Sequence, residues 1–354
     1  MDIEANYKKF QSSDSRLYGI DIARLSAMFM VVLLHNLLQG GVLDWTLDSA
    51  KDLMYMTLEN YAIIAVNVFA LISGYLGVGK VFRPTKLFYL WVGAFAWSAG
   101  SALFGFCIGA EVDSWFYRSF FPVLGQNYWY FNSFILLELF VPILNAAVAR
   151  FKSRDLLFLT FGIVFVSVVL GFPNGLGMNR GYSAIWLIVL WLVGSSIRLN
   201  WDLISDRISS LRLLFACIFI PVVSTCFEFE YRRRAMDPGQ WIEYVSPLVT
   251  IQSICFFILV ARIEIADKSV RNLLKLFSPS AFGVYLIDCS SWFYGIWLSG
   301  RFKWILEFHS YFGVPSILLI SAVMFIGFLF AETVRLRLFN VLLAKIAIFR
   351  KTRY

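Results

Sequence analysis

Charged residues are scarce in this chain of 354 residues: they make up 15% of it, whereas 59% of the residues are apolar. Soluble domains carry about 25% charged residues and have no core large enough for so much apolar surface. The composition therefore excludes an ordinary soluble domain. Cysteine is also sparse, since the five cysteines contain no CxxC pair. We expect neither a dithiol site nor a metal site from them.

Long apolar runs are the main feature of the sequence. Runs of about 20 residues recur along the chain, which is the length that crosses the hydrocarbon core of a bilayer as a helix. They predict an all-α, polytopic membrane bundle of ten helices joined by short loops. The expected spans cover residues 20–39, 61–79, 87–109, 128–148, 156–172, 182–198, 211–227, 244–262, 280–298 and 312–331.

Lysine and arginine gather on one side of the predicted membrane. Of the 31 such residues, 22 fall in segments that share a side with the N-terminus and 8 in the alternate loops. Because cytoplasmic loops carry the excess of positive charge, both termini are expected to be cytoplasmic. The net charge of +8 follows from that topology, so no nucleic-acid partner is inferred. We expect a tail over 1–19, a transmembrane domain over 20–332 and a basic segment on the cytoplasmic surface over 333–354.

The first predicted span contains His35, one of only two histidines, eleven residues after Arg24. At 100° per residue both side chains lie on one helix face, roughly 16 Å apart along the axis. Ionisable groups within a membrane are costly, so both are functional candidates. An imidazole suits general-base work on a hydroxyl, and a cation nearer the cytoplasm suits an anionic donor. The alternatives are a packing role for His35 and a local ion pair between Arg24 and Asp21.

Other polar side chains fall within the spans or at their ends. They are Asn67, Ser73, Asn132, Glu138, Gln252 and Asp288. For the amides and the serine we expect interhelical hydrogen bonds that pack the bundle, whereas the two acids are open to either role. Aromatic residues near the expected outer boundary are chiefly interfacial anchors, although such rings also stack on sugars. These aromatic residues are Trp115, Tyr117, Tyr128, Trp129 and Trp241.

Several short motifs follow one another along nearly the whole chain. They are Arg24-x10-His35, NVFALISGYL at 67–76, RPTK at 83–86, YWYF at 128–131, LFVP at 139–142 and SAFGVYLID at 280–288. Their order and spacing resemble those of the membrane-bound acyltransferase-3 family, whose members acylate bacterial surface glycans and other exported molecules. Two positions depart from the family pattern. Lys86 lacks the planar fork of the usual arginine, and Asp288 stands where many relatives have histidine.

The resemblance implies transfer of an acyl group, most often acetyl, from cytoplasmic acyl-coenzyme A to a hydroxyl of a glycan or glycolipid. It places the chain in a bacterial plasma (inner) membrane, among membrane lipids, with acetyl-CoA as co-substrate. His35 and Arg24 are then catalytic, with His35 acting as general base or forming an acyl-histidine. The donor-binding candidates are Arg24, Arg83, Lys86, Ser73 and Tyr75. The candidates along the substrate path are Asn67, Glu138 and Asp288, of which either acid would orient the imidazole or bind acceptor hydroxyls.

Two other classes of function remain open from the sequence. A transporter or flippase of a glycan or small solute would use the intramembrane charges as a proton relay. It predicts symmetry between the two halves of the chain, and no clear internal repeat is visible. A non-catalytic scaffold would not need His35 and Arg24 on one helix face. The oligomeric state is open as well.

Overall fold

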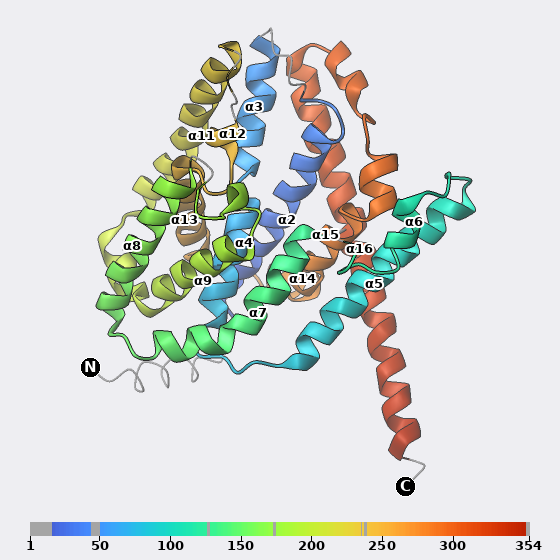
Figure 1. Cartoon of the computed structure of the whole chain (residues 1–354), viewed down its shortest axis with the longest axis horizontal. Helices are drawn as coiled ribbons and strands as arrows, with labels where there is room; N and C mark the ends of the chain where they lie inside the picture. The colour runs from blue at the N-terminus through green and yellow to red at the C-terminus, as the bar shows by residue number, and fades with distance from the viewer. Residues whose placement is uncertain are drawn as a thin grey trace.

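The structure, a computed structural model, describes residues 16–43, 50–125, 128–172, 175–234, 236 and 239–351. Every regular element within these residues is a helix (Figure 1), so the predicted all-α fold is confirmed. The helices are α2 (Tyr18–Leu38), α3 (Ala50–Ala62), α4 (Ala65–Gly77), α5 (Pro84–Cys107), α6 (Ser114–Arg118), α7 (Trp129–Val148), α8 (Ser153–Gly171), α9 (Ala184–Leu199), α10 (Trp201–Arg207), α11 (Ser210–Arg233), α12 (Gly239–Ile242), α13 (Pro247–Ala261), α14 (Lys268–Phe277), α15 (Ala281–Asp288) and α16 (Ser310–Lys351). Short 3-10 turns (η1, Asn179–Gly181; η2, Ser278–Ser280; η4, Lys303–Glu307) and one π-helical turn (η3, Phe293–Trp297) join some of them.

Seven helices in the described part of the chain are long and apolar enough to cross a membrane. They are α2, α3 together with α4, α5, α7, α8, α11 and α16, and the bent pair α9 and α10 makes an eighth if it counts as one span. Ten full-length spans are therefore not confirmed. The predicted span at 244–262 is the 15-residue helix α13. The one at 280–298 is α15, which has only 8 residues, followed by a break and a π-helical turn.

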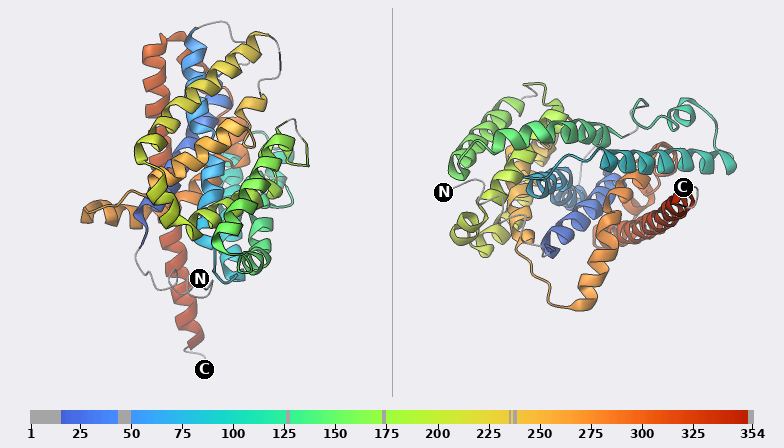
Figure 2. Two further views of the ribbon diagram at one scale, coloured as in Figure 1. Left: turned by 90° about the vertical axis from the view of Figure 1, so that its left-hand side faces the viewer. Right: turned by 90° about the horizontal axis from the view of Figure 1, so that it is seen from below.

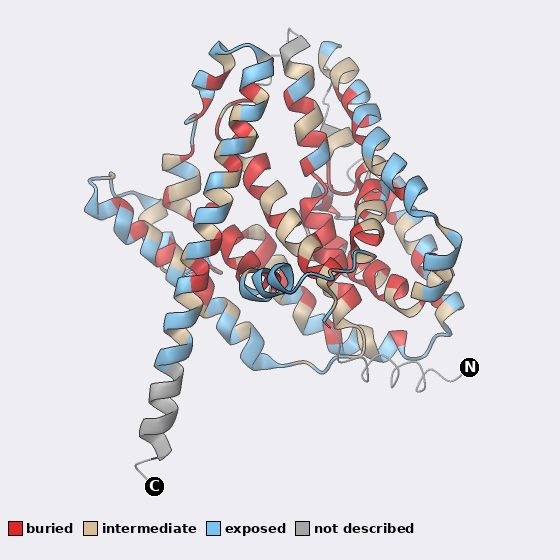
Figure 3. Cartoon of the chain, turned by 180° about the vertical axis from the view of Figure 1, so that it is seen from behind, coloured by how far each residue is buried: buried red, intermediate tan, exposed pale blue. Residues whose placement is uncertain are grey.

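The distribution of apolar side chains shows which surface faces lipid. Buried residues gather in the centre of the bundle, around α2, α4 and α9, while exposed ones line its periphery (Figure 3). Large apolar side chains are exposed on the outer helices, among them Phe158, Phe161, Phe215, Ile326 and Phe330. An exposed apolar surface of this extent is stable against hydrocarbon and not against water. The chain is therefore a multi-pass membrane protein.

Close contact between α4 and α9 forms the middle of the bundle. A Cβ atom on Gly74 would collide with the backbone of Trp191, and one on Gly194 would collide with the carbonyl oxygen of Leu71. Small residues of this kind let two membrane helices approach at backbone distance. The approach fixes the position of α4, whose C-terminal half forms one wall of the cavity described below.

The last helix extends beyond the bundle as one continuous rod (Figure 2). The sequence predicts a span ending at residue 331 and a separate surface segment after it, but α16 runs without a break to Lys351; residues 352–354 lie outside the described part. Glu332 accepts a hydrogen bond from Trp97 Nε1 of α5 (2.6 Å), which ties α16 to α5, and another from Arg335 Nε of its own helix (2.6 Å). Arg335, the first basic residue of the predicted C-terminal segment, is therefore paired with a residue that contacts α5.

The contact between α4 and α9 can be tested by adding a side chain at Gly74. We expect Gly74→Val to lower the midpoint of thermal unfolding in detergent by roughly 5 °C or more, because overpacking a close contact costs about 1–3 kcal/mol. Gly162→Val on α8 is the matched control, since nothing lies within 4 Å of its added Cβ. Equal midpoints for the two variants would show that the helices do not approach at Gly74.

Candidate functional site

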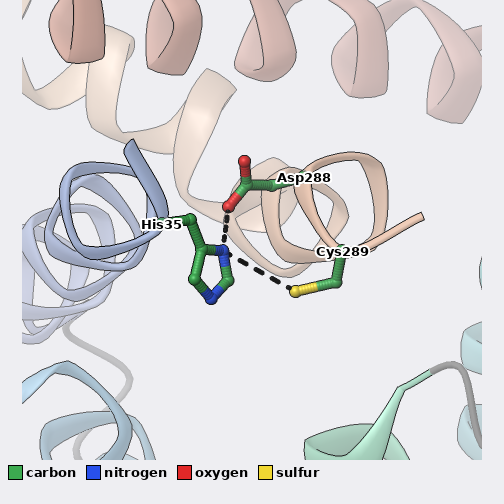
Figure 4. Close-up of side chains that lie close together, drawn as sticks. All are labelled: His35, Asp288 and Cys289. Carbon is green, nitrogen blue, oxygen red and sulfur yellow. Dashed lines mark hydrogen bonds and ion pairs between the residues drawn. The ribbon is translucent and has the colours of Figure 1, made fainter. Parts of the chain in front are cut away.

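The two residues at the centre of the site come from the ends of two helices. His35 lies in the last turn of α2, and Asp288 is the last residue of α15. His35 Nδ1 lies 2.6 Å from Asp288 Oδ2 (Figure 4). The Asp288 side chain has no exposed surface, whereas 22% of the His35 side chain is exposed. A buried carboxylate needs a hydrogen-bond donor, and here the imidazole supplies one.

This contact determines which nitrogen of the imidazole is free. An ionised carboxylate only accepts, so a neutral imidazole in this position donates Nδ1–H to Asp288 and keeps the lone pair of Nε2. Nε2 points away from both Asp288 and Cys289 (Figure 4). The pair thus has the arrangement in which a buried acid orients a histidine and stabilises its protonated form. Nε2 can take up a proton from a hydroxyl placed beside it.

Polar contacts hold both helix ends in place. On α2, Asn36 Nδ2 donates to Ser321 Oγ of α16 (2.9 Å). On the other side, Tyr128 OH donates to the Leu286 carbonyl oxygen (2.9 Å). Just after the break, Ser290 Oγ donates to Ser101 Oγ of α5 (2.8 Å). A helix that stops within a membrane bundle exposes backbone polar groups and commonly marks a binding site.

Cys289 and Tyr294 complete the immediate surroundings of the imidazole. Cys289 Sγ lies 3.9 Å from His35 Nδ1, and the Tyr294 ring meets the imidazole edge-on at 4.9 Å. One donor atom each from His35, Asp288 and Cys289 falls within 4.8 Å of the others. Two ligands of one zinc ion would stand about 3.3 Å apart. The 2.6 Å contact between His35 and Asp288 is instead the length of a hydrogen bond.

A basic cavity of about 720 Å³ lies near the other end of α2. Its cationic lining residues are Arg24, Lys80, Arg83 and Lys86, and its single carboxylate is Glu138. Ser73 and several apolar side chains line the rest, among them Phe69, Leu76, Trp191 and Phe282. The structure therefore brings together four of the five predicted donor-binding residues.

Positive charge exceeds negative charge in this cavity. Lys86 Nζ pairs with Glu138 Oε1 at 2.7 Å, which leaves the other three cations without a carboxylate in the cavity wall. Partial burial lowers the pKa of Lys80, and the neighbouring cationic side chains, Lys86 first among them, lower it further. A phosphate-bearing ligand would relieve this repulsion, because charge-assisted hydrogen bonds to phosphate are among the strongest in proteins.

Arg24 contacts Ser278 as well as Asp21, the partner of the local ion pair that the sequence allows. Its Nη1 donates to Ser278 Oγ at 2.8 Å and lies 3.4 Å from Asp21 Oδ1. Asp21 is bound more closely by Arg16 Nε, at 2.6 Å, and by Ser278 Oγ, also at 2.6 Å. The guanidinium of Arg24 is thus oriented by Ser278, a residue that the sequence does not single out, and remains on the cavity wall.

Two of the predicted path residues, Glu138 and Asn67, and the predicted donor residue Tyr75 make their contacts elsewhere than at the imidazole. Glu138 pairs with Lys86, so Asp288 alone of the two acids orients His35. Asn67 is fully buried, donates to the Tyr244 carbonyl oxygen and accepts from Trp186 Nε1, which is the packing role left open for an amide. Tyr75 does not line the basic cavity.

Tyr75 lines a second cavity of about 900 Å³ instead. Its hydroxyl accepts a hydrogen bond from Arg198 Nη1 at 3.1 Å, and the Arg198 guanidinium lies 4.9 Å from the Tyr75 ring centroid. Ser73, two residues earlier on α4, faces the basic cavity. The two predicted donor residues therefore point to different faces of the same helix.

Helix α15 connects the basic cavity with the imidazole. Phe282 lines the cavity, Tyr285 follows almost one turn later and Asp288 ends the helix, about 9 Å from Phe282 along the axis. The Phe282 ring contacts those of Phe69 (6.1 Å) and Tyr285 (5.7 Å). Aromatic rings therefore pack along α15 between the basic cavity and Asp288.

Comparison with known proteins adds one finding. The profile of a protein family described as "Acyltransferase domain" matches residues 17–336. This range contains both the His35–Asp288 pair and the residues of the basic cavity. Neither the curated proteins nor the solved structures contain a match.

The hydrogen bond to Asp288 can be tested by nitrogen NMR of the histidines. With His309→Gln, His35 is the only histidine left in the chain. We expect ¹⁵N shifts at alkaline pH that show a proton on Nδ1 and a bare Nε2, because the buried carboxylate selects that tautomer. Asp288→Asn should lose this preference. A proton on Nε2 in the parent protein would contradict the arrangement.

Proposed function

The chain belongs to the acyltransferase-3 family of membrane proteins, and from this premise we propose that it acylates glycans in a bacterial plasma membrane. The acyl group, most often acetyl, comes from cytoplasmic acyl-CoA and is transferred to a hydroxyl of a cell-surface or exported glycan. One observation carries the proposal: near one end of α2 a buried carboxylate holds Nδ1 of His35 and leaves Nε2 without a contact to Asp288, while near the other end Arg24 lines a basic cavity. We propose that donor and acceptor approach this one base from these two ends.

The basic cavity suits the phosphates of coenzyme A. Arg24 and Arg83 offer planar guanidinium forks that bind phosphate in two places, and Lys80 adds a point charge. The apolar wall formed by Trp191 and Phe282 suits the uncharged arm that carries the thioester. Since the arm must reach His35 from this cavity, we propose that it follows α15 past Tyr285.

The transfer then needs only proton movement at His35. Nε2 removes the proton of the acceptor hydroxyl as its oxygen attacks the thioester carbon. The carbon–sulfur bond breaks, the imidazolium returns the proton to the leaving thiolate, and the products are an ester and free coenzyme A. Asp288 stabilises the imidazolium while it exists. An acyl-histidine route would use the same nitrogen as nucleophile and would leave donor label on the protein when no acceptor is present.

The family match favours this enzyme over the transporter that the sequence leaves open. A proton relay would need titratable groups in series between the two sides of the membrane. Between Arg24 and His35, however, α2 offers only uncharged side chains. The charged groups of the site stand at the two ends of the path, as transfer between a cytoplasmic donor and an external acceptor requires.

The catalytic role of the pair can be measured with purified protein, acetyl-CoA and total surface polysaccharide, by release of free thiol. We expect His35→Gln to abolish turnover. Asp288→Asn should lower kcat by about 10²- to 10⁴-fold with little change in the KM for acetyl-CoA, because the wrong tautomer then faces the hydroxyl. His309→Gln is the matched control, since His309 is exposed and stacks on Tyr311. Full activity of His35→Gln would refute the assignment.

The donor cavity predicts a pH-dependent affinity for coenzyme A. The pKa of Lys80 is lowered, so as the pH rises this side chain loses its proton before the pH reaches the ordinary lysine pKa of about 10.4. The affinity for coenzyme A should therefore fall as the pH rises from neutral towards that value. Lys80→Met should weaken binding roughly fivefold near neutral pH. Lys80→Arg should keep the affinity and remove its alkaline loss. Calorimetric titration with coenzyme A measures all three, and identical curves would exclude Lys80 from the donor site.

A further inference from the structure

The cavity of about 900 Å³ beside Tyr75 is rich in arginine, and we call it the arginine cavity. Its wall contains Arg16, Arg198, Arg262 and Arg271, and Glu264 is its single carboxylate among the described residues. Asp21 pairs with Arg16 at 2.6 Å, but positive charge still exceeds negative charge in the wall. None of the described residues lines both this cavity and the basic cavity, so the two cavities are separate.

The ends of five helices enclose the arginine cavity, which lies where α2 and α11 begin and where α4, α9 and α13 end. The sequence predicts this side of the bundle to be cytoplasmic, because it carries the excess of lysine and arginine. Helix N-termini attract anions, since their first N–H groups have no partner within the helix and the helix dipole is positive there. Those of α2 and α11 both line the cavity, and Leu17, which precedes α2, has no side chain that could cap it.

Arg262 is held at the cavity wall by neutral groups. Its Nη2 donates to the carbonyl oxygens of Ile204 (3.2 Å) and Ser205 (3.3 Å), and its Nη1 donates to Ser210 Oγ (3.1 Å). Its Nε is buried and has no hydrogen-bond partner within the part of the chain that the structure describes. Neutral acceptors orient a guanidinium without cancelling its charge, which then remains available to an anion.

Arg271 joins the arginine cavity to helix α14, on which it lies. Its Nε donates to the Ile265 carbonyl oxygen (2.6 Å), and its guanidinium carbon lies 5.5 Å from the centre of the Tyr18 ring, which also lines the cavity. A cation over an aromatic face is attracted to it, so this contact keeps the Arg271 side chain at the wall. Helix α14 itself lies at the edge of the bundle and runs crosswise to α16 (Figure 2).

Helix α14 has a basic face and an apolar face. At 100° per residue, Lys268, Arg271 and Lys275 lie on one side of it, and Val270, Leu273 and Leu276 lie on the other. The three apolar side chains are 40%, 55% and 36% exposed. A helix that lies across the spans with two such faces is typical of the membrane interface, where the apolar side enters the lipid and the basic side meets anionic headgroups.

We propose that the arginine cavity binds the headgroup of an anionic phospholipid from the leaflet against which α14 lies. The phosphodiester accepts hydrogen bonds from Arg262 and Arg271, and the apolar face of α14 lies among the acyl chains of the same leaflet. A volume of about 900 Å³ is that of a small-molecule site. The phosphates of coenzyme A have a cavity of their own, and they would leave the exposed apolar face of α14 unexplained. Binding of the lipid does not involve His35 and is independent of the proposed transfer.

Calorimetric titration of the full chain in an uncharged detergent tests the binding with three probes. They are dihexanoyl phosphatidylglycerol, dihexanoyl phosphatidylcholine and inorganic phosphate. The two lipids share their acyl chains and differ in net charge, whereas phosphate is an anion without acyl chains. We expect the phosphatidylglycerol to bind about tenfold more tightly than either of the others, because it alone offers both a net negative charge and acyl chains.

Variants of the cavity wall locate the binding. Arg271→Gln and Arg262→Gln should each weaken the binding of phosphatidylglycerol about fivefold, because each removes charge-assisted hydrogen bonds to the phosphate. Arg212→Gln is the matched control and should bind as the parent does. Arg212 is exposed in the first turn of α11, on the same side of the bundle, and does not line the cavity. Coenzyme A binding by each variant shows that it is folded.

Four results would overturn the lipid site: no binding of phosphatidylglycerol, equal binding of the two lipids, phosphate binding as tight as that of phosphatidylglycerol, or equal loss in Arg271→Gln and Arg212→Gln. Lys80→Met separates the two cavities, since it should weaken the binding of coenzyme A and leave that of phosphatidylglycerol unchanged. Displacement of the lipid by coenzyme A would show that both occupy one site and would contradict the assignment. Lipid binding by a protein that never releases thiol would leave the lipid site standing and refute the enzyme.

Discussion

The hydrogen bond between His35 and Asp288 is the interaction on which the rest of the site depends. A carboxylate without exposed surface, 2.6 Å from Nδ1, fixes the tautomer and the rotation of the imidazole together. Without it, His35 would be a half-buried polar side chain at the end of a helix, free to turn either nitrogen towards the substrate. With it, one nitrogen carries a proton and the other is a base. The membrane strengthens this effect, because water does not compete for the carboxylate.

The helices around the pair meet two requirements of a membrane that separates the reactants. Helix α2 carries Arg24 in its N-terminal part and His35 in its last turn, which is the separation that the proposed donor site and proposed base require. Helix α15 is short instead. Because it ends within the bundle, its last residue, Asp288, contacts the imidazole. Aromatic side chains pack along α15 between the basic cavity and Asp288. In the proposed transfer, a thioester that moves along α15 to His35 would be surrounded by these rings and shielded from water, which would otherwise compete with the acceptor.

The sequence predicts the class of fold and half of the site. Apolar run lengths show a helical membrane protein, and helix periodicity places Arg24 and His35 on one face, because both depend on local properties of the chain. Run lengths do not reveal where a helix stops, so α15 is mistaken for a full span: its break after Asp288 depends on contacts with Tyr128 and Ser101. Local sequence patterns also do not show which helices contact each other.

The two acids and the aromatic residues illustrate that limit. The sequence treats Glu138 and Asp288 alike, and only the positions of α5 and α15 assign the first to Lys86 and the second to His35. In the sequence, the residue type and the position of Trp129 are those of an interfacial anchor. It stacks on Tyr182 and Tyr244 because a strained loop and a turn far along the chain bring those rings to it.

A structure of the protein with a non-hydrolysable acyl-CoA analogue would test the central claim most directly. We expect the phosphates against Arg24 and Arg83, the arm along α15, and the carbonyl carbon roughly 5 Å from His35 Nε2, which leaves room for one hydroxyl oxygen between them. An acyl group bound elsewhere, or an imidazole closed off from the basic cavity with the analogue in place, would contradict the account.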